Sequence, residues 1–211
     1  WPGGRTLMAV LQQPSLSDAA LRQIIGGYQA QALAPDPTTP VADTPPKPAG
    51  VLVPLVASSA EWRVLLTERT SHLTHHAGQI SFPGGRVEPD DPSPAMAALR
   101  EAEEEIGLKP ERVELIGTLD EYRTVTNYCV TPVVGLIGDT GTLQRDENEV
   151  EAIFDVPLSH FLNPDNFERH DRIVDGRTRS FYAVPYQKRF IWGATAAMLK
   201  NLATIIRDQL D

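Results

Sequence analysis

Hydrophobic side chains recur three and four positions apart in several parts of the chain, which is typical of helices with one buried face. Helices are predicted over three ranges: 17–32, 94–106 and 190–208. The middle helix has the clearest ends. Ser93 followed by Pro94 favours a helix start, because serine caps free N–H groups and proline is tolerated in the first turn. Gly107 favours a helix end.

Shorter apolar runs bounded by turn-forming residues predict β-strands. They are expected at 51–57, 62–67, 79–82, 112–120, 128–136 and 149–155. Asp175-Gly176 lies between two further β-like runs, and this dipeptide is typical of a hairpin turn. Strands and helices that alternate in this way predict an α/β domain.

The segment 34–50 contains six of the 18 prolines, which disfavours regular structure there. We expect an extended linker, or a strap laid on the surface. The chain is therefore divided into residues 1–50, with the first helix and this proline-rich segment, and a compact domain over residues 51–211.

The chain has 211 residues and a formal net charge of −9, which argues against nucleic acid as a partner. A phosphate-containing substrate would need positive charge from elsewhere, and a metal ion is the obvious source. The single cysteine, Cys129, excludes an intrachain disulfide and fits a reducing compartment, so a cytoplasmic location is expected. No apolar run approaches the roughly 20 residues that span a bilayer, so no membrane association is expected.

Acidic residues cluster on one face of the middle helix. Glu101, Glu104 and Glu105 fall within an arc of about 100° at helical spacing, whereas Leu99 and Ile106 fall on the opposite face. One interpretation is a solvated acidic surface. However, like charges at this spacing cost about 0.2–0.5 kcal/mol per pair, and no basic residue lies on the stripe. A divalent cation such as Mg²⁺, which prefers carboxylate oxygens, would make the cluster favourable.

The same helix carries a recognisable motif. Its spacing of glycine, arginine and glutamate resembles the Nudix box, on these residues: Gly85, Arg100, Glu101, Glu104, Glu105 and Gly107. Asp91 stands where the box has its first glutamate, but one extra residue separates it from Arg100, which leaves the role of Asp91 open.

The sequence before the box resembles the signature of the coenzyme A pyrophosphatase subfamily of Nudix hydrolases. The similar stretches are Leu65-Leu66-Thr67-Glu68-Arg69-Thr70, Gly78-Gln79 and Phe82-Pro83-Gly84-Gly85. The resemblance implies an α/β/α sandwich around a mixed β-sheet. It also implies hydrolysis of the diphosphate of coenzyme A or its derivatives, with Mg²⁺ or Mn²⁺, to 3′,5′-ADP and 4′-phosphopantetheine.

We assign candidate roles on this basis. The metal ligands are Glu101, Glu104 and Glu105, and Glu101 and Glu149 are rivals for the general base, with Glu147 close behind Glu149. Arg100 is expected to pair with a carboxylate beside the reacting groups. The substrate-binding candidates are Arg69, His76, Gln79, Phe82, Gly84 and Gly85. Arg69 is either a phosphate ligand or a surface ion-pair residue, since guanidinium suits both.

Two other functions are compatible with the motif. One is a Nudix hydrolase for a different nucleoside diphosphate derivative, such as ADP-ribose or a dinucleotide. The other is a non-catalytic Nudix protein that senses a nucleotide, which the complete set of glutamates disfavours. The sequence does not indicate an oligomeric state or a preference between free and acylated coenzyme A.

Overall fold

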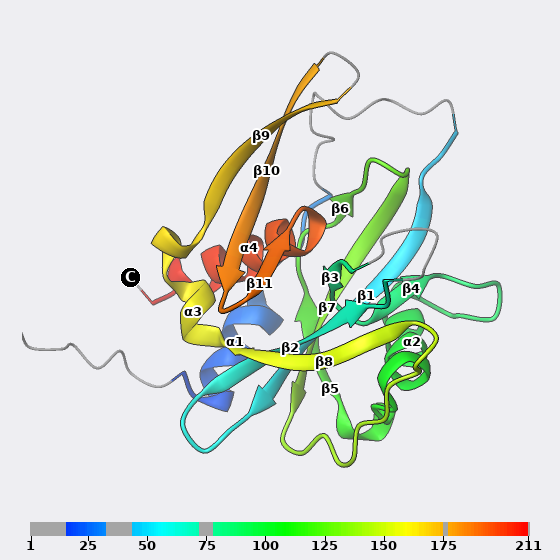
Figure 1. Cartoon of the computed structure of the whole chain (residues 1–211). Coiled ribbons are helices and arrows are strands. Elements are labelled where there is room, and N and C mark those ends of the chain that lie inside the picture. Colours follow the sequence, from blue (N-terminus) through cyan, green and yellow to red (C-terminus); the bar gives the residue numbers. More distant parts are fainter. Residues whose placement is uncertain (1–15, 33–43, 72–77, 175–176, 211) are drawn as a thin grey trace, which may run out of the picture.

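The computed structural model describes residues 16–32, 44–71, 78–174 and 177–210 (Figure 1). The helices are α1 (Asp18–Gly27), α2 (Pro94–Ile106), α3 (Leu158–Leu162) and α4 (Ala194–Arg207), with 3₁₀ turns at Pro110–Arg112 and Pro164–Asn166. The strands are β1 (Lys47–Ala57), β2 (Trp62–Arg69), β3 (Ile80–Ser81), β4 (Gly84–Arg86), β5 (Glu114–Thr118), β6 (Tyr122–Arg123), β7 (Tyr128–Ile137), β8 (Val150–Pro157), β9 (Glu168–Val174), β10 (Arg177–Tyr186) and β11 (Arg189–Trp192).

A mixed β-sheet forms the centre of the molecule. Its main path runs β3-β2-β1-β7-β5, while β4 pairs with β1, β6 with β7 and β8 with β2. Strands β1 and β7 are parallel and the other pairings are antiparallel. Parallel neighbours need a long crossover between them, and that crossover contains α2.

The two faces of the sheet bury two separate cores. Side chains alternate along a strand, so neighbouring residues point to opposite faces. Leu52 and Leu65 contact the core formed with α2, whereas Val53 and Leu66 contact the core formed with α1 and α4. Figure 1 shows α2 on one side of the sheet, with α1 and α4 on the other. The expected α/β/α sandwich around a mixed sheet is confirmed.

A second, smaller sheet has the order β11-β10-β9. Arg177 pairs with Val174, so β9 and β10 form the antiparallel hairpin expected around Asp175-Gly176, although the turn itself lies outside the described residues. One face of this sheet packs on α4, with Val184 and Ile191 fully buried.

Local signals predict the bounds of α2 correctly. The Ser93 side chain accepts a hydrogen bond from the Met96 N–H, and Gly107 ends the helix with φ +69°. The first helix is shorter than expected and ends at Gly27, where two successive glycines disfavour helix. Strand β1 begins at Lys47 rather than at residue 51, so the sheet starts inside the proline-rich segment.

The prediction of a helix from residue 190 is wrong at its start. Residues 190–192 belong to β11, and α4 begins only after Gly193, which has φ +66° and ψ −135°. Aromatic and β-branched side chains such as Phe190 and Ile191 favour strand. The apolar residues that follow have helical spacing, and extending this pattern back to residue 190 placed the helix start too early. Trp192 is therefore the last residue of a strand.

Candidate active site

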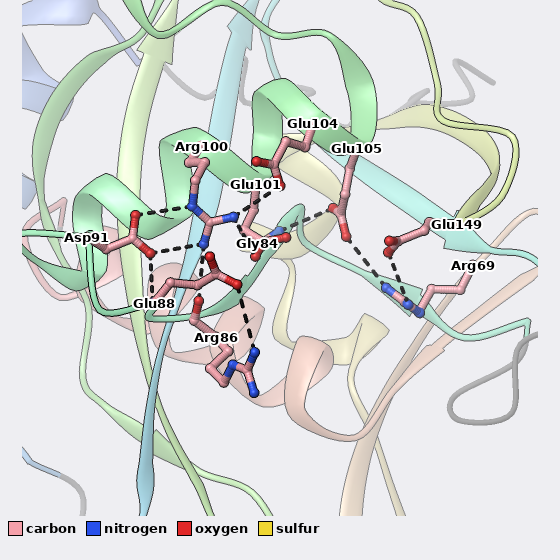
Figure 2. Close-up of polar contacts among 10 residues, drawn as sticks. All are labelled: Arg69, Gly84, Arg86, Glu88, Asp91, Arg100, Glu101, Glu104, Glu105 and Glu149. Atoms are coloured by element: carbon pink, nitrogen blue, oxygen red, sulfur yellow. Dashed lines mark hydrogen bonds and ion pairs between the residues drawn. The ribbon is translucent and has the colours of Figure 1, made fainter.

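The glutamates of α2 project toward the glycine loop at the start of β4 (Figure 2). Their side chains differ in burial: Glu105 is 5% exposed, Glu101 is 19% exposed and Glu104 is 59% exposed. The three carboxylates therefore range from buried to exposed, and they do not form a uniform stripe on the surface.

Glu105 is a buried carboxylate with few compensating partners. Its Oε2 accepts a hydrogen bond from the Gly84 N–H at 3.2 Å, and Arg69 Nη1 lies 3.5 Å from its Oε1. The pKa of Glu105 is raised to about 8, mainly by burial and also by the nearby carboxylates of Glu101 and Glu149, while Gly84 and Arg69 act to lower it. Burial also raises the pKa of Glu101, although Arg100 opposes this.

Arg100 joins the carboxylates on the outer side of the helix, as expected. Its Nε and Nη2 donate to Asp91 at 3.1 and 2.9 Å, and its Nη1 donates to both Glu101 and Glu104 at 3.0 Å. Its Nη2 also donates to the carbonyl of Arg86 at 3.2 Å. Asp91 therefore reaches Arg100 despite the extra residue between them, and the pKa of Asp91 is lowered, mainly by this hydrogen bonding.

The glycine loop is shaped by close approach. A Cβ on Gly85 would lie less than 3.0 Å from the carboxylate of Glu101, and a Cβ on Gly84, which has φ +150°, would lie as close to the carbonyl of Gly50. Only residues without a side chain allow the loop to pass this near to both the helix and β1. Gly84 and Gly85 thus lie against the carboxylate cluster.

Main-chain hydrogen bonds attach the loop that carries Glu149 to the end of α2. The Asp146 N–H donates to the Glu105 carbonyl at 2.8 Å, and the Gln144 N–H donates to the Ile106 carbonyl at 2.9 Å. The Thr70 N–H donates to the Glu149 carbonyl at 2.9 Å, which fixes this residue beside the end of β2.

Arg69 lies between the two acidic segments. Its Nη2 is 3.5 Å from Glu149 Oε2, while Nη1 faces Glu105 (Figure 2). Glu147 does not join this cluster, since its side chain is 81% exposed and pairs with Arg145 at 3.7 Å. The geometry thus places Glu149, and not Glu147, among the candidate catalytic groups.

The remaining substrate-binding candidates have different positions. The carbonyl of Gln79 accepts the Arg69 N–H at 2.9 Å, which puts Gln79 beside the cluster. Phe82 is only 2% exposed and packs in the core on the α1 and α4 side, so core packing accounts for its ring here and its role in substrate binding stays a prediction. A large apolar residue within a motif can contribute to core packing and not to binding. His76 lies outside the described residues.

The carboxylates have the chemistry of a site for a hard divalent cation. Glu101, Glu104 and Glu105 offer only oxygen donors, and the raised pKa values of Glu101 and Glu105 reflect buried acidic groups that a cation would stabilise as anions. Within the described ranges, no three His, Cys, Asp or Glu side chains already stand close enough together to hold a metal ion. Arg69 and Arg100 now contact these carboxylates. The glutamate side chains must therefore rotate before they can bind a metal ion together.

A sandwich of this kind, with a glutamate-rich helix beside a glycine loop, is the architecture of the Nudix family. Residues 46–176 match the family model for the NUDIX domain. The chain is 42% identical over 155 residues to a protein of Escherichia coli K12 that is described as the uncharacterized Nudix hydrolase NudL, covering 74% of this chain and 80% of that protein. A protein of Shigella boydii serotype 18 with the same description has the same identity and coverage.

The chain belongs to the Nudix family. It is a Nudix hydrolase that acts on a nucleoside diphosphate derivative, and Nudix hydrolases generally use divalent metal ions. Solved structures similar to it include a binary complex of the C. elegans Ap4A hydrolase, at 20% identity and TM-score 0.45 over 54% of this chain and 81% of that one. Another is RenU of M. smegmatis, at 20% identity and TM-score 0.46 over 56% of this chain and 74% of that one. In the parts of the chain that the structure describes, no helix is long and apolar enough to cross a membrane.

Proposed function

We propose that this Nudix hydrolase cleaves the diphosphate of coenzyme A or its derivatives to 3′,5′-ADP and 4′-phosphopantetheine, with Mg²⁺ or Mn²⁺. The observation that carries the proposal is the meeting of two sequence motifs at one carboxylate. Arg69 and Gly84 come from the stretch that resembles the coenzyme A subfamily, and both contact Glu105 of the Nudix box, at 3.5 and 3.2 Å. These contacts support the proposal, because they bring residues of the subfamily signature to the carboxylate cluster.

The residues divide into three tasks. Glu101, Glu104 and Glu105 are the ligands of a divalent cation, which when bound neutralises diphosphate charge and lowers the pKa of a coordinated water. Glu149 takes the proton from the attacking water as general base. Its position beside Arg69 supports this role, whereas the exposed side chain of Glu147 lies away from the cluster.

Arg69 binds a phosphate oxygen in this proposal. Its side chain is 25% exposed and its guanidinium lies between Glu105 and Glu149, so it can exchange a carboxylate for a phosphate without a large movement. Arg100 positions the ligands: two of its nitrogens stay on Asp91 while Nη1, which now donates to Glu101 and Glu104, can release them.

A substrate panel tests the proposal. Coenzyme A, ADP-ribose, NADH and diadenosine tetraphosphate are incubated with the protein and Mg²⁺, Mn²⁺ or EDTA, and the products are identified by mass. We expect coenzyme A to be cleaved in preference, to 3′,5′-ADP and 4′-phosphopantetheine, and only with metal. Equal or better cleavage of ADP-ribose would indicate that the substrate is a nucleoside diphosphate derivative other than coenzyme A. Binding without turnover of any compound would indicate a sensor.

A further inference from the structure

The small sheet β9-β10-β11 has a face that packs on neither core. The registers place four rings on this face, which we name the aromatic face: His170, Phe181, Phe190 and Trp192. The His170 and Phe181 rings stack with centroids 5.5 Å apart, Phe181 meets Trp192 edge-on at 5.4 Å, and His170 meets Phe190 at 5.7 Å. Phe190 is 45% exposed.

Two arginines adjoin these rings. Arg172 and Arg179 are direct partners across β9 and β10, on the same side of the sheet as Phe181. Like charges placed directly opposite each other destabilise a sheet. Among the described residues no ion pair relieves either guanidinium, and Arg179 Nε is buried without a hydrogen-bond partner. The acidic side chain on this face, Glu168, is already hydrogen-bonded to His170 at 2.7 Å.

The aromatic face is turned away from α4. The opposite face of the small sheet packs toward α4, where Lys200 Nζ lies 4.9 Å above the ring of Tyr182.

Strand β11 also contacts β3, which pairs with the end of β2 that leads into Arg69. Arg189 of β11 is 3.7 Å from Glu68, the residue before Arg69 in the sequence. Figure 1 shows β11 beside β3. The small sheet that carries the aromatic face thus adjoins the end of β2 from which Arg69 reaches Glu105.

We propose that the aromatic face, with Arg172 and Arg179, binds the 3′-phosphoadenosine end of the substrate. The adenine ring stacks on this face at the exposed ring of Phe190, because every base offers a π-face to aromatic side chains. The 3′-phosphate monoester accepts hydrogen bonds from the two guanidinium groups and removes their mutual repulsion. In a chain with a net charge of −9, a pair of unneutralised arginines beside rings fits an anionic nucleotide. This inference rests on the proposed coenzyme A activity and assigns the part of the substrate that the Nudix box does not hold.

The test compares coenzyme A with dephospho-coenzyme A, which lacks the 3′-phosphate. Arg172→Gln, alone and with Arg179→Gln, should lower kcat/KM for coenzyme A about tenfold or more, mainly through KM. The same variants should change kcat/KM for dephospho-coenzyme A less than about twofold. Arg169→Gln is the matched control, because Arg169 is on the opposite face of β9, where it donates to Ser180. Equal losses with both substrates, or no loss with either, would overturn the proposal.

A binding measurement separates this proposal from the proposed function. By calorimetry, the wild-type protein should bind 3′,5′-ADP at least about tenfold more tightly than 5′-AMP, and Arg172→Gln should abolish the difference. If neither coenzyme A nor dephospho-coenzyme A is hydrolysed, the proposed function fails. The calorimetric comparison then decides by itself whether the aromatic face binds the nucleotide. Equal affinity of the wild-type protein for the two nucleotides would refute the site. So would a wild-type dimer that Phe190→Glu converts to a monomer with nucleotide binding unchanged, since the face would then belong to a second copy of the chain.

Discussion

The main-chain N–H of Gly84 donates a hydrogen bond of 3.2 Å to the carboxylate of Glu105, 21 positions later in the sequence. This contact joins the glycine loop to the buried end of the glutamate helix. One backbone donor, together with Arg69 at 3.5 Å, does not compensate for the burial of the charge, and the pKa of Glu105 accordingly rises to about 8. The site therefore holds an acidic group that stabilises the fold only while it is protonated or neutralised by a cation.

Glu105→Gln should stabilise the metal-free protein increasingly as pH rises. The pKa of Glu105 is raised from 4.5 to about 8 on folding, so its contribution to stability is complete below about pH 4.5 and is lost as pH rises through 8. The variant keeps an oxygen for the Gly84 N–H and has no charge to bury. Its stability relative to the wild-type protein should grow between pH 5 and 8, by at most ~5 kcal/mol.

Thermal unfolding in EDTA at several pH values measures this difference. Glu103→Gln is the control, because Glu103 lies on the same helix but pairs with Lys109 at 2.6 Å, away from the cluster. A Glu105→Gln effect that does not change with pH would contradict the buried, proton-binding state of Glu105.

Glu104→Gln should lose turnover by orders of magnitude and retain the fold. Glu104 is 59% exposed and its described polar contact is with Arg100, so the amide removes charge without leaving a cavity. The expected loss reflects a missing carboxylate ligand for the cation. Turnover at saturating Mg²⁺ and a thermal unfolding curve are the two measurements. Turnover like that of the wild-type protein would remove Glu104 from the metal site.

The sequence predicts the helix of the site better than its surroundings. Ser93 and Gly107 define α2 because capping is a local interaction, and helical spacing alone brings the three glutamates to one side. Spacing does not reveal that Glu105 is buried and Glu104 exposed, because this depends on where the Gly84 loop passes. It also does not reveal the core position of Phe82, since a ring within a motif serves packing or binding equally well.

Asp91 shows how the fold absorbs one additional residue. Just before the extra position, a turn holds Asp91: its N–H donates to the Glu88 carbonyl at 3.0 Å and the Glu88 N–H donates back to Asp91 Oδ2 at 2.8 Å. This turn returns the carboxylate to Arg100, a contact that counting residues from the motif leaves open. The arginines and rings of the small sheet could have been noticed as alternating positions in 168–192, but only the strand register shows that they share a face.

Gly85→Ala should lower turnover much more than it lowers stability. A Cβ at this position would meet the Glu101 carboxylate at less than 3.0 Å, so the side chain of Glu101 must move from its place beside Arg100. Gly138→Ala is the matched control, because no atom lies within 4 Å of the Cβ it would add. Steady-state kinetics and metal titration of both variants test this. Equal effects of the two substitutions would show that Glu101 adapts freely.

Glu149→Gln should separate proton transfer from metal binding. Glu149 comes from the loop before β8, and its contact with Arg69 brings it to the cluster from outside α2. A general base contributes on the order of 10²–10⁴-fold to the rate, so kcat should fall within that range while metal affinity changes little. The acidic limb of the pH–rate profile should flatten, since this limb reports ionisation of the base. Glu101→Gln, in contrast, should weaken metal binding as well as turnover, because Glu101 is proposed as a ligand.

Glu147→Gln is the control for Glu149→Gln, two positions away in the same loop. Its side chain is 81% exposed and faces Arg145, so its removal should leave both kcat and the pH profile unchanged. Measuring both variants with the same metal and substrate makes the comparison independent of the absolute rate. If Glu149→Gln retains the wild-type kcat and acidic limb, Glu149 is not the base. A loss of kcat in Glu147→Gln instead would mean that the loop rearranges to present Glu147 during catalysis.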